Sequence, residues 1–108
     1  RYVFKHAATR MPEVIREVLD AVGLTAKDID LLVPHQANIR INQAAAAALE
    51  IPEERVVHNI DRYGNTTAGS IPIALSEALE QGRVRPGDLV CLAGFGAGFT
   101  WGAILVRW

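Results

Sequence analysis

The sequence holds three polar or glycine-rich motifs whose residue types could do chemistry together. The first is Pro34-His35-Gln36-Ala37-Asn38, the second surrounds Asn65, and the third is the glycine run Gly94–Phe99. An imidazole N–H and a carboxamide N–H aimed at one point can stabilise a developing oxyanion or enolate. His35 and Asn65 are therefore a candidate pair for that chemistry.

Each of these features also has a purely structural explanation, which the residues alone leave open. His35 could cap the helix that follows it and Asn65 could supply a turn, because both residue types are common in loops. A glycine-rich hairpin is common too, although its glycines would let a backbone N–H such as that of Ala97 act as a second oxyanion donor. The run is not a dinucleotide-binding motif, which needs a following helix and an acidic residue about 20 positions on.

Two other kinds of site find less support in the sequence. Cys91 lies in an apolar run with no charged neighbour to lower the pKa of its thiol, so we expect an inert buried thiol rather than a nucleophile. The three histidines, His6, His35 and His58, lie far apart along the chain, and no His/Glu pair has ligand spacing. We therefore expect no metal site.

A scaffold of alternating helices and strands must position the motifs. Apolar residues at helical spacing predict a helix behind Pro12 that ends at Gly23, an alanine-rich helix over about 38–49, and a helix over 71–79 closed by Gly82. Apolar runs predict strands over 29–33, 56–60, 89–93 and 99–108, the last two joined through Gly94–Gly98. If the first two strands are parallel, His35 and Asn65 emerge at the same edge of the sheet. We expect an α/β fold with a mixed sheet, helical crossovers and a C-terminal antiparallel hairpin.

Composition limits the classes of protein that fit. The chain has 108 residues, 50% of them apolar, a formal net charge of -1 and one cysteine. These values indicate one compact globular domain of a reducing, cytoplasmic setting, and they exclude a disordered chain or a disulfide scaffold. The sequence has no stripe of basic residues of the kind that binds nucleic acid. No apolar run reaches the roughly 18 to 20 residues that span a bilayer. The N-terminus has no signal-peptide layout and begins within a folded-looking segment, so we expect a fragment of a longer protein.

The three motifs, in this order and at these spacings, resemble the C-terminal half of β-ketoacyl-acyl-carrier-protein synthase III, and the resemblance covers essentially the whole chain. It implies a thiolase-like fold, in which two similar α/β halves stack as αβαβα and pair as a homodimer. Residues 1–108 would be the C-terminal catalytic half, and the N-terminal half would be absent from this chain. Such enzymes start fatty acid synthesis by moving an acyl group from acyl-CoA onto a cysteine and condensing it with malonyl-acyl-carrier protein, with no metal or organic cofactor.

The resemblance also implies roles for individual residues. His35 and Asn65 match the catalytic pair that binds the malonyl thioester oxygen during decarboxylation. The backbone N–H of Ala97 matches the oxyanion donor for the acyl-enzyme carbonyl. Phe95 matches the aromatic residue at the catalytic centre, where the substrate's pantetheine arm arrives.

Four further residues match substrate and partner contacts of the family. Phe4 and Asn38 match positions that line the pantetheine tunnel. Lys5 and Arg40 match basic groups that dock the acidic acyl-carrier protein, although such residues are commonly just solvated side chains.

The catalytic cysteine of the family belongs to its N-terminal half, and Cys91 matches it in neither position nor setting. We therefore predict that this chain alone cannot complete the reaction. Two other functions stay open: a related Cys-His-Asn ketosynthase of polyketide or other CoA-linked synthesis, and a non-catalytic half-fold that dimerises or binds a carrier protein.

Overall fold

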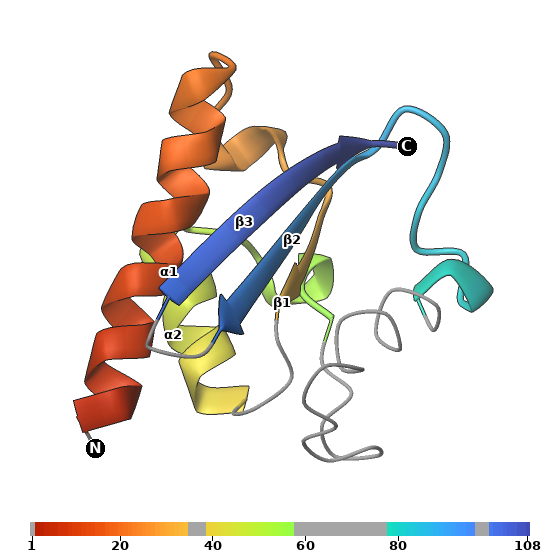
Figure 1. The fold of residues 1–108 in the computed structure, drawn as a ribbon. Coiled ribbons are helices and arrows are strands. Elements are labelled where there is room, and N and C mark those ends of the chain that lie inside the picture. Colours follow the sequence, from red (N-terminus) through yellow and green to blue (C-terminus); the bar gives the residue numbers. More distant parts are fainter. Residues whose placement is uncertain (1, 35–38, 58–77, 97–99) are drawn as a thin grey trace.

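The computed structural model describes residues 2–34, 39–57, 78–96 and 100–108 (Figure 1). The helices and strands are α1 (Tyr2–Ala21), β1 (Leu31–Pro34), α2 (Ile39–Ala48), β2 (Leu89–Gly96) and β3 (Thr100–Arg107). Two short 3-10 turns, Ala26–Asp28 and Glu53–Arg55, connect them, and residues 78–80 are helical. The predicted α/β class is confirmed.

The described strands form one mixed sheet in the order β1-β2-β3. β1 is parallel to β2, with Pro34 opposite Ala93, and β2 is antiparallel to β3, with Leu92 opposite Ile104. The predicted mixed sheet and C-terminal hairpin are therefore confirmed. Val56 adds a single parallel bridge to Leu32 on the other side of β1. This bridge lies at the first residue of the strand predicted over 56–60. Residues 58–60 lie outside the described part of the chain.

The two faces of the sheet pack against different elements. The covered face, made of Leu32, Cys91, Ala93, Ala103 and Leu105, packs against α1 and α2, which lie together on one side of the sheet in Figure 1. The open face, made of Leu31, Val33, Val90, Leu92 and Ile104, contacts Val57 and Ala78 near β1. Strand residues alternate between these faces because successive side chains point to opposite sides.

The start of α1 differs from the sequence prediction. The helix begins at Tyr2 and contains Pro12, so the prediction of a start behind Pro12 is wrong. A proline inside a helix lacks the N–H for one backbone hydrogen bond. Burial on both sides of it offsets that loss, since Met11 and Ile15 are 0% exposed and Val14 is 4% exposed.

The glycine run also differs from its predicted form. β2 continues past Ala93 through Gly94 to Gly96, which lies opposite Thr100 of β3. The predicted connection over Gly94–Gly98 is therefore too long, because the strand pairing takes in its first three residues. Glycine weakens a strand only modestly, and an adjacent partner strand supplies the pairing that local propensity does not.

The ends of the helices follow the predicted glycine caps. Gly23 has a φ of 73° and Gly82 a φ of 70°, the left-handed region that favours glycine. The N–H of Leu24 donates to the Leu19 carbonyl at 2.9 Å, which closes α1. α2 ends in the same way but with Glu50 at a φ of 59°, a conformation that costs energy for a residue with a Cβ.

Candidate active site

The three motif-bearing segments begin at one end of the sheet, here called the motif end, where β1 and β2 finish. Pro34 ends β1, Gly96 ends β2, and Val57 lies beside β1 through its N–H bond to the Leu32 carbonyl at 3.0 Å. Because β1, β2 and residues 56–57 run in the same direction, their carboxyl ends share this end, the lower one in Figure 1. In α/β sheets, functional groups gather just past such strand ends.

Four of the predicted site residues lie in the segments that follow these strand ends. His35 and Asn38 come after Pro34, Asn65 comes in the segment after Val57, and Ala97 comes after Gly96. All four lie outside the described residues. Their convergence on one point stays a prediction, supported by the shared position of the strand ends that precede them.

The remaining predicted residues lie on described backbone. Phe4 and Lys5 are in the first turn of α1, and Phe95 is near the end of β2, opposite Trp101 of β3. For these residues the structure describes the backbone only. Arg40 is exposed in the first turn of α2, and only four residues separate Pro34 from the start of that helix. Arg40 therefore lies at the motif end, as does the N-terminal end of α1 in Figure 1.

The alanines of α2 let this helix pack closely beside α1. Ala45 is 0% exposed and Ala46 is 2% exposed, and both belong to the core of the covered face. Asn42 lies on the same buried face of α2 and is 1% exposed. We did not predict this polar residue, although the helical spacing from Ile41 to Ala45 already places position 42 on the buried side.

Cys91 lies in the covered face and is 0% exposed. Burial raises the pKa of its thiol to about 12, because the thiolate would lose its hydration. The thiol is thus protonated at neutral pH and is a poor nucleophile. The prediction of a buried structural cysteine is confirmed.

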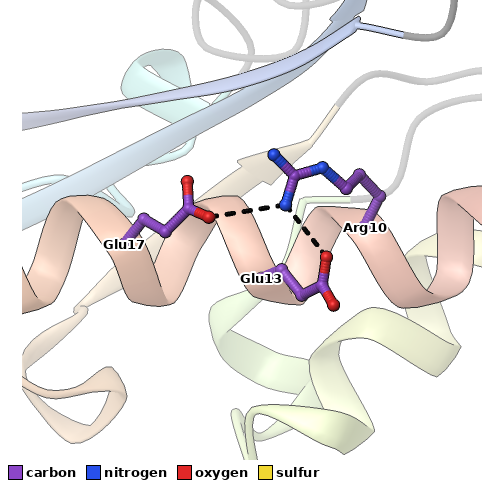
Figure 2. A network of polar contacts seen from close by, with 3 residues as sticks. All are labelled: Arg10, Glu13 and Glu17. Atoms are coloured by element: carbon purple, nitrogen blue, oxygen red, sulfur yellow. Dashed lines mark hydrogen bonds and ion pairs between the residues drawn. The ribbon is translucent and has the colours of Figure 1, made fainter.

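An ion-pair network lies on the exposed side of α1. The Nη1 of Arg10 donates to Glu13 Oε1 at 2.9 Å and to Glu17 Oε2 at 3.4 Å (Figure 2). The hydrogen bond to Glu13 is the largest cause that raises the pKa of Arg10. Solvent and salt screen such exposed pairs, so their effect on stability is small.

The order of charges along α1 opposes the helix dipole. Lys5 and Arg10 lie in its N-terminal half, whereas Glu13, Glu17 and Asp20 lie in its C-terminal half and outnumber the one basic residue there, Arg16. The first turn has no acidic residue and the last turn has no basic one. A helix is stabilised by the opposite arrangement. Helix stability therefore does not explain why a lysine occupies the first turn of α1.

A groove of about 550 Å³ lies at the other end of the helices, between the C-terminal ends of α1 and α2. Its charged lining residues are Arg16, Asp20, Lys27 and Glu50, two of each sign. Arg16 is already engaged there, since its Nη2 donates to the Ala48 carbonyl at 2.7 Å. The start of α2 lies at the motif end, so this groove is remote from the candidate site.

Metal-binding clusters and membrane-spanning helices are both absent from the described ranges. Among these residues, no three His, Cys, Asp or Glu side chains lie close enough together to hold a metal ion. In the same part of the chain, no helix has both the length and the apolar character needed to cross a membrane.

Parallel strands with motifs past their carboxyl ends, an antiparallel C-terminal hairpin and two helices on one face define the class as thiolase-like. Residues 19–108 match the family model described as 3-oxoacyl-[acyl-carrier-protein] synthase III C terminal. The chain belongs to this family. The family resemblance and the fold class predicted from the three motifs are confirmed.

The relatives agree with this assignment over the whole chain. The chain is 56% identical over 108 residues to the beta-ketoacyl-[acyl-carrier-protein] synthase III of Brucella canis, covering 100% of the chain and 33% of the relative. The crystal structure of the 3-oxoacyl-[acyl-carrier-protein] synthase III of Aquifex aeolicus is 51% identical, with a TM-score of 0.97 over 100% of the chain and 35% of that structure. The synthase III structure from Thermus thermophilus is 53% identical, with a TM-score of 0.95 over 100% of the chain and 34% of that structure. The chain thus spans about a third of the length of these relatives.

Proposed function

We propose that this chain is the C-terminal catalytic part of a β-ketoacyl-acyl-carrier-protein synthase III. The enzyme would join an acyl group from acyl-CoA to malonyl-acyl-carrier protein with loss of carbon dioxide, the first condensation of fatty acid synthesis. The observation that carries the proposal is the family match over residues 19–108. The common position of Pro34, Val57 and Gly96 at the motif end supports it.

In this mechanism, His35 and Asn65 donate N–H groups to the carbonyl oxygen of the malonyl thioester. The bond between its Cα and its carboxylate breaks, carbon dioxide leaves, and the electron pair enters an enolate whose oxygen the two donors stabilise. The enolate carbon then attacks the carbonyl of an acyl-cysteine thioester. This attack forms the new carbon–carbon bond and an oxyanion, which the N–H of Ala97 stabilises. Collapse of the oxyanion restores the carbonyl, breaks the carbon–sulfur bond and expels the cysteine thiolate.

The proposal includes a surface for the acidic acyl-carrier protein, formed by Lys5 and Arg40. Both residues belong to first helical turns at the motif end, so they would flank the entrance for the substrate. The charge order of α1, which opposes the helix dipole, favours a binding role for Lys5. Phe4, Asn38 and Phe95 would contact the pantetheine arm that carries the thioester inward.

We further propose that an N-terminal half supplies the acyl-accepting cysteine and covers the open face. The chain spans a third of the length of its Brucella relative, and Ile104 and Trp108 are 62% and 45% exposed. The complete protein would act as a homodimer in the cytoplasm. Apolar strand residues need such a cover, because their exposure to water is unfavourable.

The direct test removes each donor in the full-length protein. His35→Ala and Asn65→Ala should each lower the release of carbon dioxide from malonyl-acyl-carrier protein by about 100- to 1,000-fold, the usual effect of losing one oxyanion donor. Gln43→Ala is the matched control, because it removes an exposed carboxamide from α2 without touching the motifs. Unchanged carbon dioxide release in both variants would contradict the assignment.

The same assay separates the alternative functions. A ketosynthase of polyketide or other CoA-linked synthesis would use malonyl-CoA in place of malonyl-acyl-carrier protein as its second substrate. A non-catalytic half-fold would bind the carrier protein, yet release no carbon dioxide even with the native sequence. We expect turnover with the carrier-bound substrate, in keeping with the high identity to the Brucella synthase.

A further inference from the structure

Arg83 connects two parts of the chain that are distant in sequence. Its Nη2 donates to the Glu54 carbonyl at 3.0 Å and to the Val56 carbonyl at 3.2 Å. Charged donors make stronger hydrogen bonds than neutral ones, and a planar guanidinium loses little freedom when it bridges two acceptors. Arg83 therefore holds residues 54–56 in place relative to the turn in which it lies.

The peptide group between Val56 and Val57 is held from both sides. Its N–H, on Val57, donates to the Leu32 carbonyl of β1 at 3.0 Å. Its carbonyl, on Val56, faces the opposite way and accepts from Arg83. A neighbouring strand would ordinarily satisfy such a carbonyl, and here a side chain does so. This peptide group is the last one described before the segment 58–77.

The backbone of Arg83 closes the helix at the other end of that segment. Its N–H donates to the Ala78 carbonyl at 3.0 Å, next to Gly82 in the left-handed conformation. Ala78 is 0% exposed and belongs to the same core cluster as Val57, beneath the open face. Arg83 thus contacts the described residues on both sides of 58–77, through its side chain on one side and through its backbone on the other.

We propose that Arg83 is a positioning residue for Asn65, because its contacts hold Val56, just before the segment 58–77 that contains Asn65, relative to Ala78, just after that segment. The inference rests on the function proposed above and adds a residue to it that touches neither substrate nor reacting atoms. Asn65 acts only in decarboxylation, whereas acyl transfer uses the cysteine of the other half. Loss of the Arg83 side chain should therefore impair one half-reaction selectively.

The test compares the two half-reactions in the full-length protein. Arg83→Met keeps the length and the apolar stem of the side chain but removes the donors. Condensation with malonyl-acyl-carrier protein should fall by about 10- to 100-fold, the effect of misplacing a catalytic group by roughly 1 Å. Acyl transfer from acyl-CoA to the cysteine should stay within about twofold of the native rate. Arg83→Lys, which keeps one charged donor, should recover part of the condensation rate.

Arg107→Met is the matched control. Like Arg83, Arg107 donates from its guanidinium to the backbone, in its case to the Gly87 carbonyl at 3.1 Å, but it lies at the opposite end of the sheet from Gly96. This variant should leave the ratio of the two half-reactions unchanged. Thermal unfolding of all variants reports any general loss of stability, and Arg83→Lys keeps the test usable if Arg83→Met folds poorly.

Two results would overturn the inference. One is an unchanged condensation rate in Arg83→Met, and the other is a parallel fall of both half-reactions, which would assign Arg83 a structural role alone. Asn65→Ala, measured alongside, distinguishes a failure of this inference from a failure of the proposed function. If it abolishes condensation while Arg83→Met does not, the inference is wrong and the proposed function stands. If it leaves condensation intact, the proposed function is wrong and the inference falls with it.

Discussion

The covered face and the open face of the sheet differ in how far this chain buries them. On the covered face, α1 and α2 leave Ile15, Leu32 and Cys91 at 0% exposure. On the open face, Leu31 and Val33 are buried beneath Val57 and Ala78. Ile104 of β3, on the same face, is 62% exposed.

The described helices complete one layer of the fold and leave β3 without a cover on its other side. A single exposed apolar residue is ordinary. Ile104, however, lies directly opposite Leu92 in a strand pair whose alternate residues are well packed on the covered face. Substitutions on the two faces should therefore differ in their effect on stability.

The largest effect is expected on the covered face. Ile15→Ala should lower the free energy of unfolding by about 2 to 5 kcal/mol, because it leaves a cavity where α1 packs against the sheet. Urea unfolding of the full-length protein measures the change. Val22→Ala is the control, since Val22 follows α1 and is 61% exposed, so its truncation should cost much less. Equal losses in the two variants would contradict the distinction between covered and exposed positions.

Alkaline pH offers a second test of the covered face. An unfolded thiol has a pKa of about 8.5, whereas burial raises the pKa of Cys91 to about 12. The stability that the neutral buried thiol contributes is fully present below about pH 8.5, and it is lost as the pH rises toward 12. We expect the free energy of unfolding to fall by up to about 1.4 kcal/mol per pH unit above about pH 9.

Unfolding measured from pH 8 to 11 in the native protein and in Cys91→Ala checks this slope. The variant lacks the thiol and should lose less stability with rising pH than the native protein does. Identical pH profiles would show that the thiol is not shielded from water. Resistance of the folded protein to a thiol reagent at pH 8 is an independent readout.

The open face should respond differently in the isolated chain and in the full-length protein. Ile104→Ser should change the stability of residues 1–108 by less than about 0.5 kcal/mol, as at other exposed sites, and it should weaken self-association in sedimentation. In the full-length protein the same substitution should cost more than about 1 kcal/mol if the other half covers β3. Equal costs in both settings would argue against that cover.

The smallest effects concern the ends of the two helices on the covered face. Gly23→Ala should cost about 1 kcal/mol, and Glu50→Gly should stabilise by up to about 1 kcal/mol, because both positions have a positive φ. A Cβ added at Gly23 meets no atom within 4 Å, so the cost is conformational alone. Thermal unfolding measures both changes, and a stabilising Gly23→Ala would refute the account.

Residue patterns alone were enough to predict the family, the alternation of helices and strands, and the glycine helix ends. These features depend on short contiguous patterns, such as the motif around His35 or Gly23 followed by Leu24, in which neighbours in sequence are the interacting groups. The same local reasoning failed at Pro12, because the burial of apolar side chains on both sides of Pro12 keeps α1 helical there. It also failed at Gly94, because the partner strand decided where β2 ends.

Which apolar residues are covered and which remain exposed depends on contacts between segments that are distant in sequence. Val90 and Ile104 are similar residues in adjacent strands and on one face of the sheet. Val90 is 1% exposed because it packs in the same cluster as Ala78, whereas Ile104 lies outside that cluster and is 62% exposed. The contacts of Arg83 with Glu54 and Val56 likewise join residues that are 29 and 27 positions apart. No local pattern contains such pairs, because folding alone brings them within hydrogen-bond distance.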